Sequence, residues 1–172
     1  AEHIFKAVSK THIRCDGAYA VLALITGHGL LAFRDNNGIR PLSIGIRKGE
    51  NRDEYVIASE DALFISLGFT KLRDVDPGEA VFIDKNGKLF SQQCADNPIK
   101  RPCIFEYVYF SRPDSKIDEI SVYKARMRMG KKLAEQIKKT KPDHDIDVVI
   151  PIPDSSTIAA HELAVDLDIP YI

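Results

Sequence analysis

The sequence predicts a mixed fold, in which an antiparallel α+β region is followed by the beginning of an α/β region. Short apolar runs separated by Gly-containing turns fill residues 17–95, which indicates one layer of β-hairpins. An amphipathic helical pattern, a continuous apolar run, a polar turn and a second helical pattern then follow in the order of a doubly wound α/β fold. The character changes after Asn97-Pro98, so we expect one domain at residues 1–98 and another at residues 99–172.

The first domain is expected to begin with a helix at residues 2–13, because Ile4, Phe5, Val8 and Ile13 recur at roughly helical spacing. Glycine tolerates the positive φ of a tight turn, so Gly27-His28-Gly29 and Lys85-Asn86-Gly87 each predict a hairpin. A short helix is expected at residues 61–67, where Gly68 closes it. The expected strands cover residues 18–25, 30–33, 41–46, 55–58, 79–83 and 88–91.

The second domain is expected to open with an aromatic strand at residues 105–110 and a polar loop at residues 111–119. A helix is predicted at residues 121–139, with lysines at its C-terminal end that suit the helix dipole. Residues 148–152 indicate a strand buried on both faces, and a helix is expected at residues 157–167. The residues predicted to share one face of the first helix are Val122, Ala125, Met129, Leu133 and Ile137.

Composition and charge argue against several classes of partner. Lys and Arg number 24 against 25 Asp and Glu, so no basic excess indicates a nucleic-acid partner. No apolar run reaches membrane-spanning length, and the first ten residues do not resemble a signal peptide. The three cysteines are too few and too scattered for a disulfide framework, and an odd count is typical of a reducing compartment. We therefore expect a cytoplasmic protein without a membrane partner.

The turn at residues 150–156 is the strongest candidate for chemistry. A loop that leaves the carboxyl end of a parallel strand opens where α/β folds bind ligands, and the following helix offers free N–H groups to phosphate. Serine hydroxyls can also bind a hard cation such as Mg²⁺. The alternative is that Asp154, Ser155 or Ser156 merely caps the helix, and the residues alone favour that alternative.

Three other groups of residues favour structural roles. Arg34 and Arg40 flank a turn, where they could bind a carboxylate but more simply stabilise the turn with Asp35. The aromatic residues at 105–110 suit a domain seam or an ordinary core strand. None of the five histidines has a partner at metal-ligand spacing, and no cysteine has a neighbouring base. From the residues alone, no reaction can be named.

Taken in order, several motifs resemble a known family of enzymes. One series resembles the second half of a class II glutaminase domain: Gly17-Ala18-Tyr19-Ala20, Ala32-Phe33-Arg34-Asp35, Gly38-Ile39-Arg40-Pro41-Leu42, Ala58-Ser59-Glu60 and Asp76-Pro77-Gly78-Glu79. Gln93-Cys94-Ala95-Asp96-Asn97-Pro98, residues 103–115, Ile117-Asp118 and Ser121-Val122-Tyr123 resemble the amidophosphoribosyltransferases in particular. The turn at residues 151–156 is similar to the pyrophosphate loop of their phosphoribosyltransferase domain, so the resemblance extends along essentially the whole chain.

The resemblance implies a fold and a reaction. It implies the C-terminal half of an αββα N-terminal-nucleophile domain, followed by the start of a type I phosphoribosyltransferase domain. Such enzymes hydrolyse glutamine to glutamate and ammonia, and the ammonia then displaces pyrophosphate from phosphoribosyl pyrophosphate (PRPP) to give phosphoribosylamine, with Mg²⁺ as cofactor. By resemblance, Asp154, Ser155 and Ser156 bind the pyrophosphate and Ser156 binds Mg²⁺. Cys103 matches a ligand of a 4Fe-4S cluster that only some members contain, so the cluster itself is not expected here, and Tyr107 and Tyr109 match the ammonia path.

The chain lacks other parts of that machinery. It begins at Ala1, without the Cys-Gly start of the glutaminase, and it ends before the PRPP loop, so no catalytic residue is expected in it. The expectation is an inactive piece of a longer, homo-oligomeric enzyme. One alternative is a class II amidotransferase with another acceptor, although such enzymes lack a Pro-Asp-Ser-Ser turn after a buried strand. Another alternative is a non-enzymatic binding module whose reading frame ends near Ile172.

Overall fold

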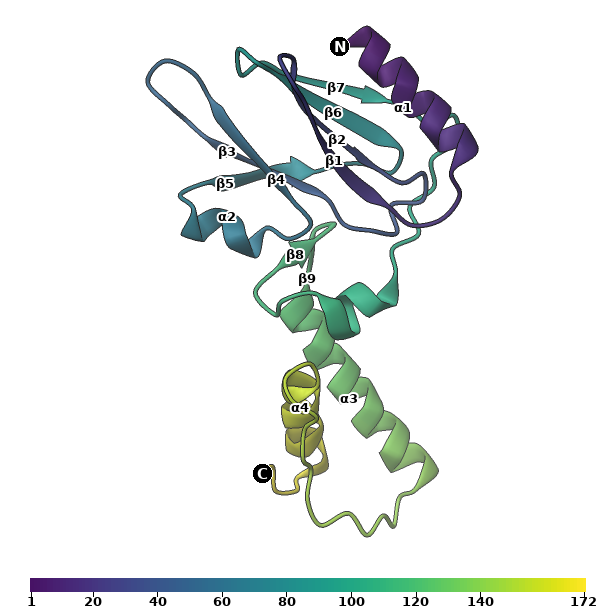
Figure 1. Ribbon diagram of the computed structural model, residues 1–172. Helices are drawn as coiled ribbons and strands as arrows, with labels where there is room; N and C mark the ends of the chain where they lie inside the picture. The colour runs from purple at the N-terminus through teal and green to yellow at the C-terminus, as the bar shows by residue number, and fades with distance from the viewer. The chain divides into compact units, whose positions relative to one another are not determined.

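The computed structural model describes residues 1–172 as two compact units, Ala1–Cys103 and Ile104–Ile172, each of which contains both helices and strands (Figure 1). The division falls five residues after the boundary expected at residue 98, on the same connecting segment.

The first unit contains two antiparallel sheets rather than the single layer predicted for residues 17–95. The four-stranded sheet has the order β1-β2-β6-β7, and the three-stranded sheet has the order β4-β3-β5. Two helices, α1 (Glu2–Arg14) and α2 (Ala62–Ser66), complete the unit. The strands are β1 (Ala20–Ile25), β2 (Gly29–Arg34), β3 (Ser43–Arg47), β4 (Glu54–Ala58), β5 (Thr70–Asp74), β6 (Glu79–Asp84) and β7 (Leu89–Gln93).

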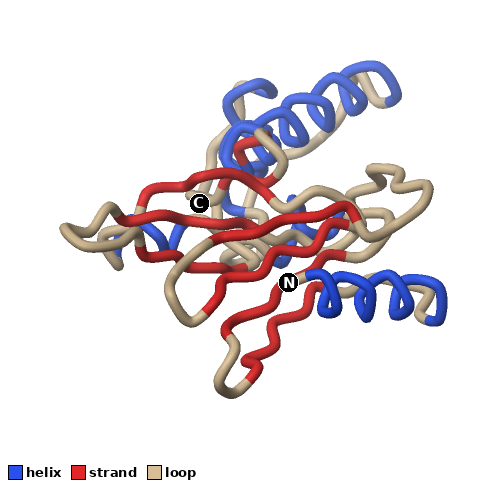
Figure 2. Tube along the Cα trace, turned by 90° about the horizontal axis from the view of Figure 1, so that it is seen from above, coloured by secondary structure: helices blue, strands red, loops and turns tan.

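Alternation along β2 and β6 explains why this unit has layers. One face of these two strands packs against α1, which contributes Phe5 and Val8 to the shared core cluster. The strand residues of this cluster are Leu31, Phe33, Ala80 and Phe82. Their neighbours Ala32 and Val81 face the opposite way and pack with Leu42, Ile44, Ile57 and Val75 around the three-stranded sheet. Figure 2 shows α1 running beside these strands. The four-stranded sheet is therefore covered on both faces, by α1 and by the second sheet.

The outer face of the three-stranded sheet is closed by α2. Phe64 of α2 is almost fully buried, and a Cβ placed on Gly45 of β3 would come within 2.9 Å of the Phe64 ring. The order of layers in this unit is therefore helix, sheet, sheet, helix. Both predicted helices and both predicted hairpins are confirmed, with ends within two residues of those expected.

One strand of this unit escaped the sequence analysis. In β5 the apolar signal is a single residue, Leu72, which is itself 44% exposed. Its charged residues are held by ion pairs instead, because Lys71 Nζ lies 2.8 Å from Asp74 and 3.2 Å from Asp61. Pairing with β3 therefore makes this segment a strand without an apolar alternation.

The second unit begins with a π-helix, η1 (Glu106–Phe110), where an aromatic strand was predicted. The backbone N–H of Ser111 donates to Glu106 O across five residues, which is the hydrogen bond that defines this helix. The buried Arg126 stabilises the turn, since its guanidinium donates to the carbonyl oxygens of Tyr107 and Ser111 at 2.8 Å each. A strand was therefore the wrong prediction, because a buried cation from a later helix satisfies these carbonyls.

The predicted polar loop at residues 111–119 contains part of a small hairpin, β8 (Lys116–Ile117) and β9 (Ile120–Ser121). Its two central residues, Asp118 and Glu119, both have positive φ, as a tight two-residue hairpin requires. The helices expected next are confirmed as α3 (Val122–Thr140) and α4 (Thr157–Leu167).

The helices α3 and α4 pack closely because small residues lie between them. Gly130 of α3 is buried, and a Cβ at this position would lie 2.2 Å from the carbonyl oxygen of Ala159 in α4. The buried side of α3 consists of Val122, Arg126, Gly130 and Ala134 rather than the predicted apolar face, of which Leu133 is 50% exposed. The helical period was predicted correctly, but the prediction of which side of the helix is buried was only partly correct.

The buried strand predicted at residues 148–152 does not form in this chain. Only Val149 pairs, through an isolated parallel bridge to Tyr171, while Ile150 and Ile152 are 70% and 77% exposed. A parallel strand needs neighbours on both sides and cover on both faces. Within residues 1–172 this segment has one short neighbour, so its apolar residues remain on the surface.

Candidate functional site

The candidate turn joins the Val149 bridge to the start of α4. Val149 N–H donates to Pro170 O at 2.9 Å, and Ile172 N–H donates to Val149 O at 3.1 Å. After Ile152 the chain turns through residues 153–156 and enters α4 at Thr157. Asp154 is exposed in this turn, and Ser155 and Ser156 are half-buried. All three predicted site residues are therefore within reach of a ligand at the start of the helix.

The hydroxyl of Ser156 stabilises the turn rather than the helix. It accepts a hydrogen bond from Ile152 N–H at 2.6 Å and donates one to Ile152 O at 2.7 Å. No side chain caps α4 through a hydrogen bond at this N-cap position, so the capping interpretation of Ser156 is wrong. A hydroxyl oxygen has two lone pairs, and one remains after these contacts.

The electrostatic environment at this end of α4 suits an anion. The first N–H groups of a helix have no acceptor within the helix, and the helix dipole places partial positive charge there. The first turn of α4 contains no acidic side chain that would neutralise this charge. The turn can therefore offer backbone N–H donors, serine hydroxyls and one exposed carboxylate to the same ligand.

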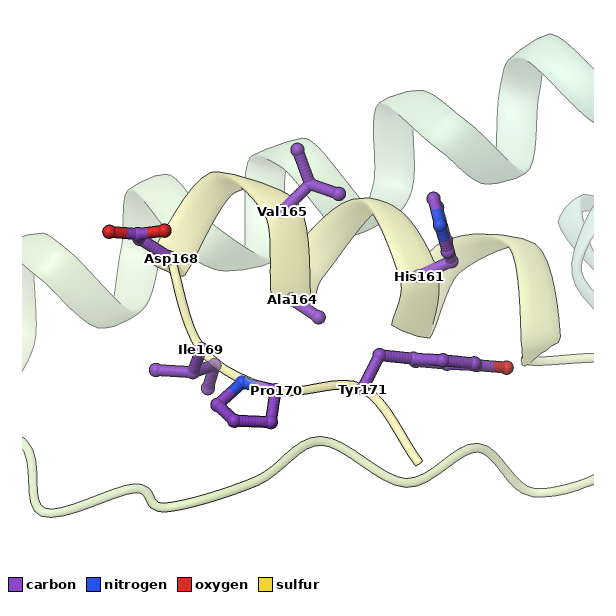
Figure 3. Close-up of a pocket in the computed structure, with 7 residues that line it drawn as sticks. All are labelled: His161, Ala164, Val165, Asp168, Ile169, Pro170 and Tyr171. Carbon is purple, nitrogen blue, oxygen red and sulfur yellow. The ribbon is translucent and has the colours of Figure 1, made fainter.

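Two hollows lie along α4, on either side of a pair of aromatic rings. His161 and Tyr171 pack edge to face with centroids 5.5 Å apart, and both line each hollow. The hollow of about 490 Å³ follows the C-terminal half of α4. Figure 3 shows this hollow, with the ring of Tyr171 extending beneath the helix. The hollow of about 400 Å³ includes Thr157 and Ile158 of the first turn of α4. Asp154, Ser155 and Ser156 line neither hollow.

The turn around Arg34 and Asp35 is structural, as the residue types favoured. Both side chains are almost fully buried. The guanidinium of Arg34 donates to the carbonyl oxygens of Gly38, Arg40 and Val75 at 2.6–2.8 Å. The carboxylate of Asp35 accepts from the N–H groups of residues 37, 39 and 40 at 3.0–3.1 Å. The charges of Arg34 and Asp35 therefore satisfy backbone groups of the turn.

The other residues expected by resemblance lie in different environments. Cys103 is partly buried, and no group of three or more His, Cys, Asp or Glu side chains that could hold a metal is present in residues 1–172. Tyr107 is buried on η1 with its hydroxyl 3.4 Å from Ile117 O, whereas Tyr109 is 62% exposed. The exposed aromatic surface at this turn therefore comes from Tyr109 and its neighbours Phe105 and Phe110.

A buried polar cluster around His12 was not among the predicted sites. His12 Nδ1 lies 2.7 Å from the Tyr19 hydroxyl, and the ring packs against Tyr19 and Phe33. Burial lowers the pKa of His12 below its ordinary value, with smaller opposing effects from Gly78 and Asp35. Helical spacing from Phe5 and Val8 places His12 on the buried side of α1, which is the signal that could have indicated burial.

Comparison with known proteins gives a consistent result, although no protein-family model matches the chain. It is similar to the amidophosphoribosyltransferases of Pseudomonas aeruginosa (59% identity over 170 residues), Escherichia coli (57% over 172) and Saccharomyces cerevisiae (47% over 174). Each match covers 99% of this chain and 34% of the relative. The chain thus spans about a third of the length of these relatives.

The chain is also similar to solved structures. Glutamine PRPP amidotransferase from B. subtilis, complexed with ADP and GMP, matches with a TM-score of 0.81 and 41% identity. The match covers 95% of this chain and 34% of that protein. Separately, no helix in residues 1–172 combines the length and apolar character needed to cross a membrane.

Proposed function

The chain is homologous to amidophosphoribosyltransferases along nearly its whole length, and from this homology we propose that it is part of such an enzyme. The proposed reaction converts PRPP, glutamine and water to 5-phosphoribosylamine, glutamate and pyrophosphate, the first step of purine synthesis. Identity of 47–59% over 99% of the chain is the observation on which the proposal depends. A segment of this length is not expected to catalyse the reaction alone.

The first unit suits the second half of a glutaminase domain. Its helix, sheet, sheet, helix layering is the order expected of the αββα fold of N-terminal-nucleophile hydrolases. The second unit suits the start of a phosphoribosyltransferase domain, since it places a parallel bridge, a polar turn and a helix in sequence. We propose that residues 1–98 and 99–172 belong to these two domains.

The turn at residues 153–156 is the proposed pyrophosphate site of PRPP. Backbone N–H groups at the start of α4 and the hydroxyl of Ser155 would donate to phosphate oxygens, in keeping with other helix N-termini that bind phosphate. The Ser156 hydroxyl would join them only on exchanging its bond to Ile152 O. The remaining lone pair of Ser156 Oγ and the exposed Asp154 are oxygen donors of the type that Mg²⁺ prefers. Bound Mg²⁺ would neutralise charge on the leaving pyrophosphate. Few protein ligands are needed, because Mg²⁺ keeps waters and substrate oxygens in its shell.

The resemblance further supports proposals about Cys103, the ammonia path and the parent enzyme. A 4Fe-4S cluster needs four ligands, and the three cysteines of this chain do not form a ligand group, so Cys103 would need partners outside residues 1–172. Tyr107 and Tyr109 are proposed to contribute to the ammonia path, with Tyr109 as the exposed member of the pair. A cytoplasmic, homo-oligomeric parent enzyme is proposed on the resemblance alone.

The test uses the full-length protein with PRPP, Mg²⁺ and glutamine, and follows release of pyrophosphate. Release that requires both glutamine and PRPP is the expected result. Glutamine hydrolysis without pyrophosphate release would instead indicate a different acceptor. The variant Ser156→Ala should then raise the Mg²⁺ and PRPP concentrations needed for half-maximal rate while leaving glutamine hydrolysis unchanged, and loss of both activities together would contradict the assigned role.

A further inference from the structure

One side of α3 is almost entirely cationic. The helix contains seven Lys or Arg residues and a single Glu, in a chain whose net charge is −1. At 3.6 residues per turn, the exposed cations fall within an arc of about 120°, opposite the side that is buried. These exposed residues are Lys124, Arg128, Lys131, Lys132, Lys138 and Lys139.

The cations in the C-terminal half of α3 have a structural explanation. Lys138 and Lys139 lie in the last turn, where the helix dipole favours positive charge, and Lys138 also donates to the carbonyl oxygen of Asp166. Lys132 forms an ion pair with Glu135 at 2.5 Å. Helix stability therefore accounts for these three side chains.

No such explanation applies to Lys124, Arg128 and Lys131. None of them forms a salt bridge with Asp or Glu, and the first turn of α3 contains no acidic residue. Lys124 lies near the positive end of the helix dipole, and Arg128 is one turn from both Lys124 and Lys131, so the three charges repel one another. Stability is lost by placing three cations here, which favours a functional role for them.

The same three side chains surround a hollow. Lys124, Arg128 and Lys131 line a space of about 330 Å³ together with Met127 and with Glu162 of α4. The cations span about 10 Å along the helix axis, given a rise of 1.5 Å per residue. The site therefore combines three positive charges, one apolar side chain and a single acidic residue.

We propose that Lys124, Arg128, Lys131 and Met127 form a docking site for a short acidic segment of another protein. Carboxylates of the segment would pair with the three cations, since the arginine fork and the lysine ammonium groups both bind carboxylate. An apolar side chain between those carboxylates would pack on Met127. The proposal is independent of the enzymatic function proposed above.

Other polyanions fit this surface less well. A nucleic acid extending along α3 would meet the exposed Asp143, Asp145 and Asp147 just beyond the helix, and their charge would repel its phosphates. An anionic membrane needs apolar side chains beside the cations, but Leu133 lies on the opposite side of the helix. A segment about 10 Å long avoids the three aspartates and needs no broad apolar face.

The test uses a fluorescein-labelled peptide in which pairs of glutamates are separated by single leucines. Its binding to the full-length protein is measured by fluorescence anisotropy in about 50 mM salt. We expect the variant Lys124→Glu/Arg128→Glu/Lys131→Glu to bind at least about tenfold more weakly than wild type. The matched control, Lys6→Glu/Lys10→Glu/Lys85→Glu, changes the net charge equally on exposed residues of the first unit and should stay within about twofold. If circular dichroism shows that charge reversal unfolds the variant, the three glutamine substitutions replace it.

Several outcomes would overturn the proposal. These are no binding to the wild-type protein, an equal loss in the two variants, or no loss in the folded glutamine variant. The proposal would also be overturned if a single-stranded oligonucleotide or phosphatidylserine vesicles bound the wild-type protein more tightly than the peptide and no longer bound the α3 variant. A tenfold loss confined to the α3 variant, with weaker binding of these two competitors, would support it.

Discussion

Replacing Gly130 by alanine tests the close packing of α3 on α4. Two effects of opposite sign compete at this position. Alanine is favoured over glycine in a helix interior by about 1 kcal/mol, which would stabilise α3. The new Cβ, however, would lie 2.2 Å from Ala159 O and 3.0 Å from Ala159 C, which are backbone atoms that cannot rotate away. The helices must therefore separate by about 1 Å to restore an ordinary contact.

Packing is expected to outweigh helix propensity. Inserting a methyl group into a well-packed contact typically costs about 1–3 kcal/mol. We expect a net destabilisation of about 1–2 kcal/mol, which corresponds to an equilibrium constant for opening of α4 that is about 5- to 30-fold larger.

Amide hydrogen exchange of α4 in the full-length protein measures this opening directly. The control Gln136→Ala changes an exposed residue of the same helix and should alter exchange by less than about twofold. Unchanged or slower exchange of α4 in Gly130→Ala would refute the reasoning, because helix propensity would then have outweighed packing.

Two further substitutions test the buried polar groups of the first unit. Burial holds the pKa of His12 below its unfolded value of 6.5, so the unfolded chain binds more protons and the free energy of unfolding should decrease as the pH falls below about 6.5. In His12→Gln this decrease should be smaller, as denaturant titrations at pH 7.5 and pH 5.5 can measure. An equal decrease in the free energy of unfolding for the variant and the wild type would contradict the role of His12. Arg34→Met removes the donor for three carbonyl oxygens, so we expect a loss of about 3 kcal/mol or more. A thermal midpoint within about 2 °C of wild type would show that water replaces the guanidinium.

The turn at residues 153–156 shows how far residue types alone can lead. The sequence predicted a polar turn between an apolar run and a helix, and both the turn and α4 are present. Whether Ser156 caps the helix or bonds to Ile152 depends on where the chain before the turn lies. That position follows from the bridge between Val149 and Tyr171, a contact between distant parts of the sequence. The resemblance to an enzyme family, by contrast, follows from the order of motifs along the sequence.

By itself, the sequence determined the elements whose signal is local. The helical period of α1, α3 and α4 and the glycine-containing hairpin turns predicted structure correctly, because periodicity and positive φ are properties of neighbouring residues. Tertiary structure decided what depends on distant partners. Arg126 turned an aromatic segment into a π-helix, pairing with β3 supported a strand with little apolar character at residues 70–74, and residues 148–152 remained exposed for want of parallel neighbours. In each case the outcome depended on a partner far along the chain. Arg126 and β3 supplied hydrogen bonds to their segments, whereas residues 148–152 had only the single bridge to Tyr171.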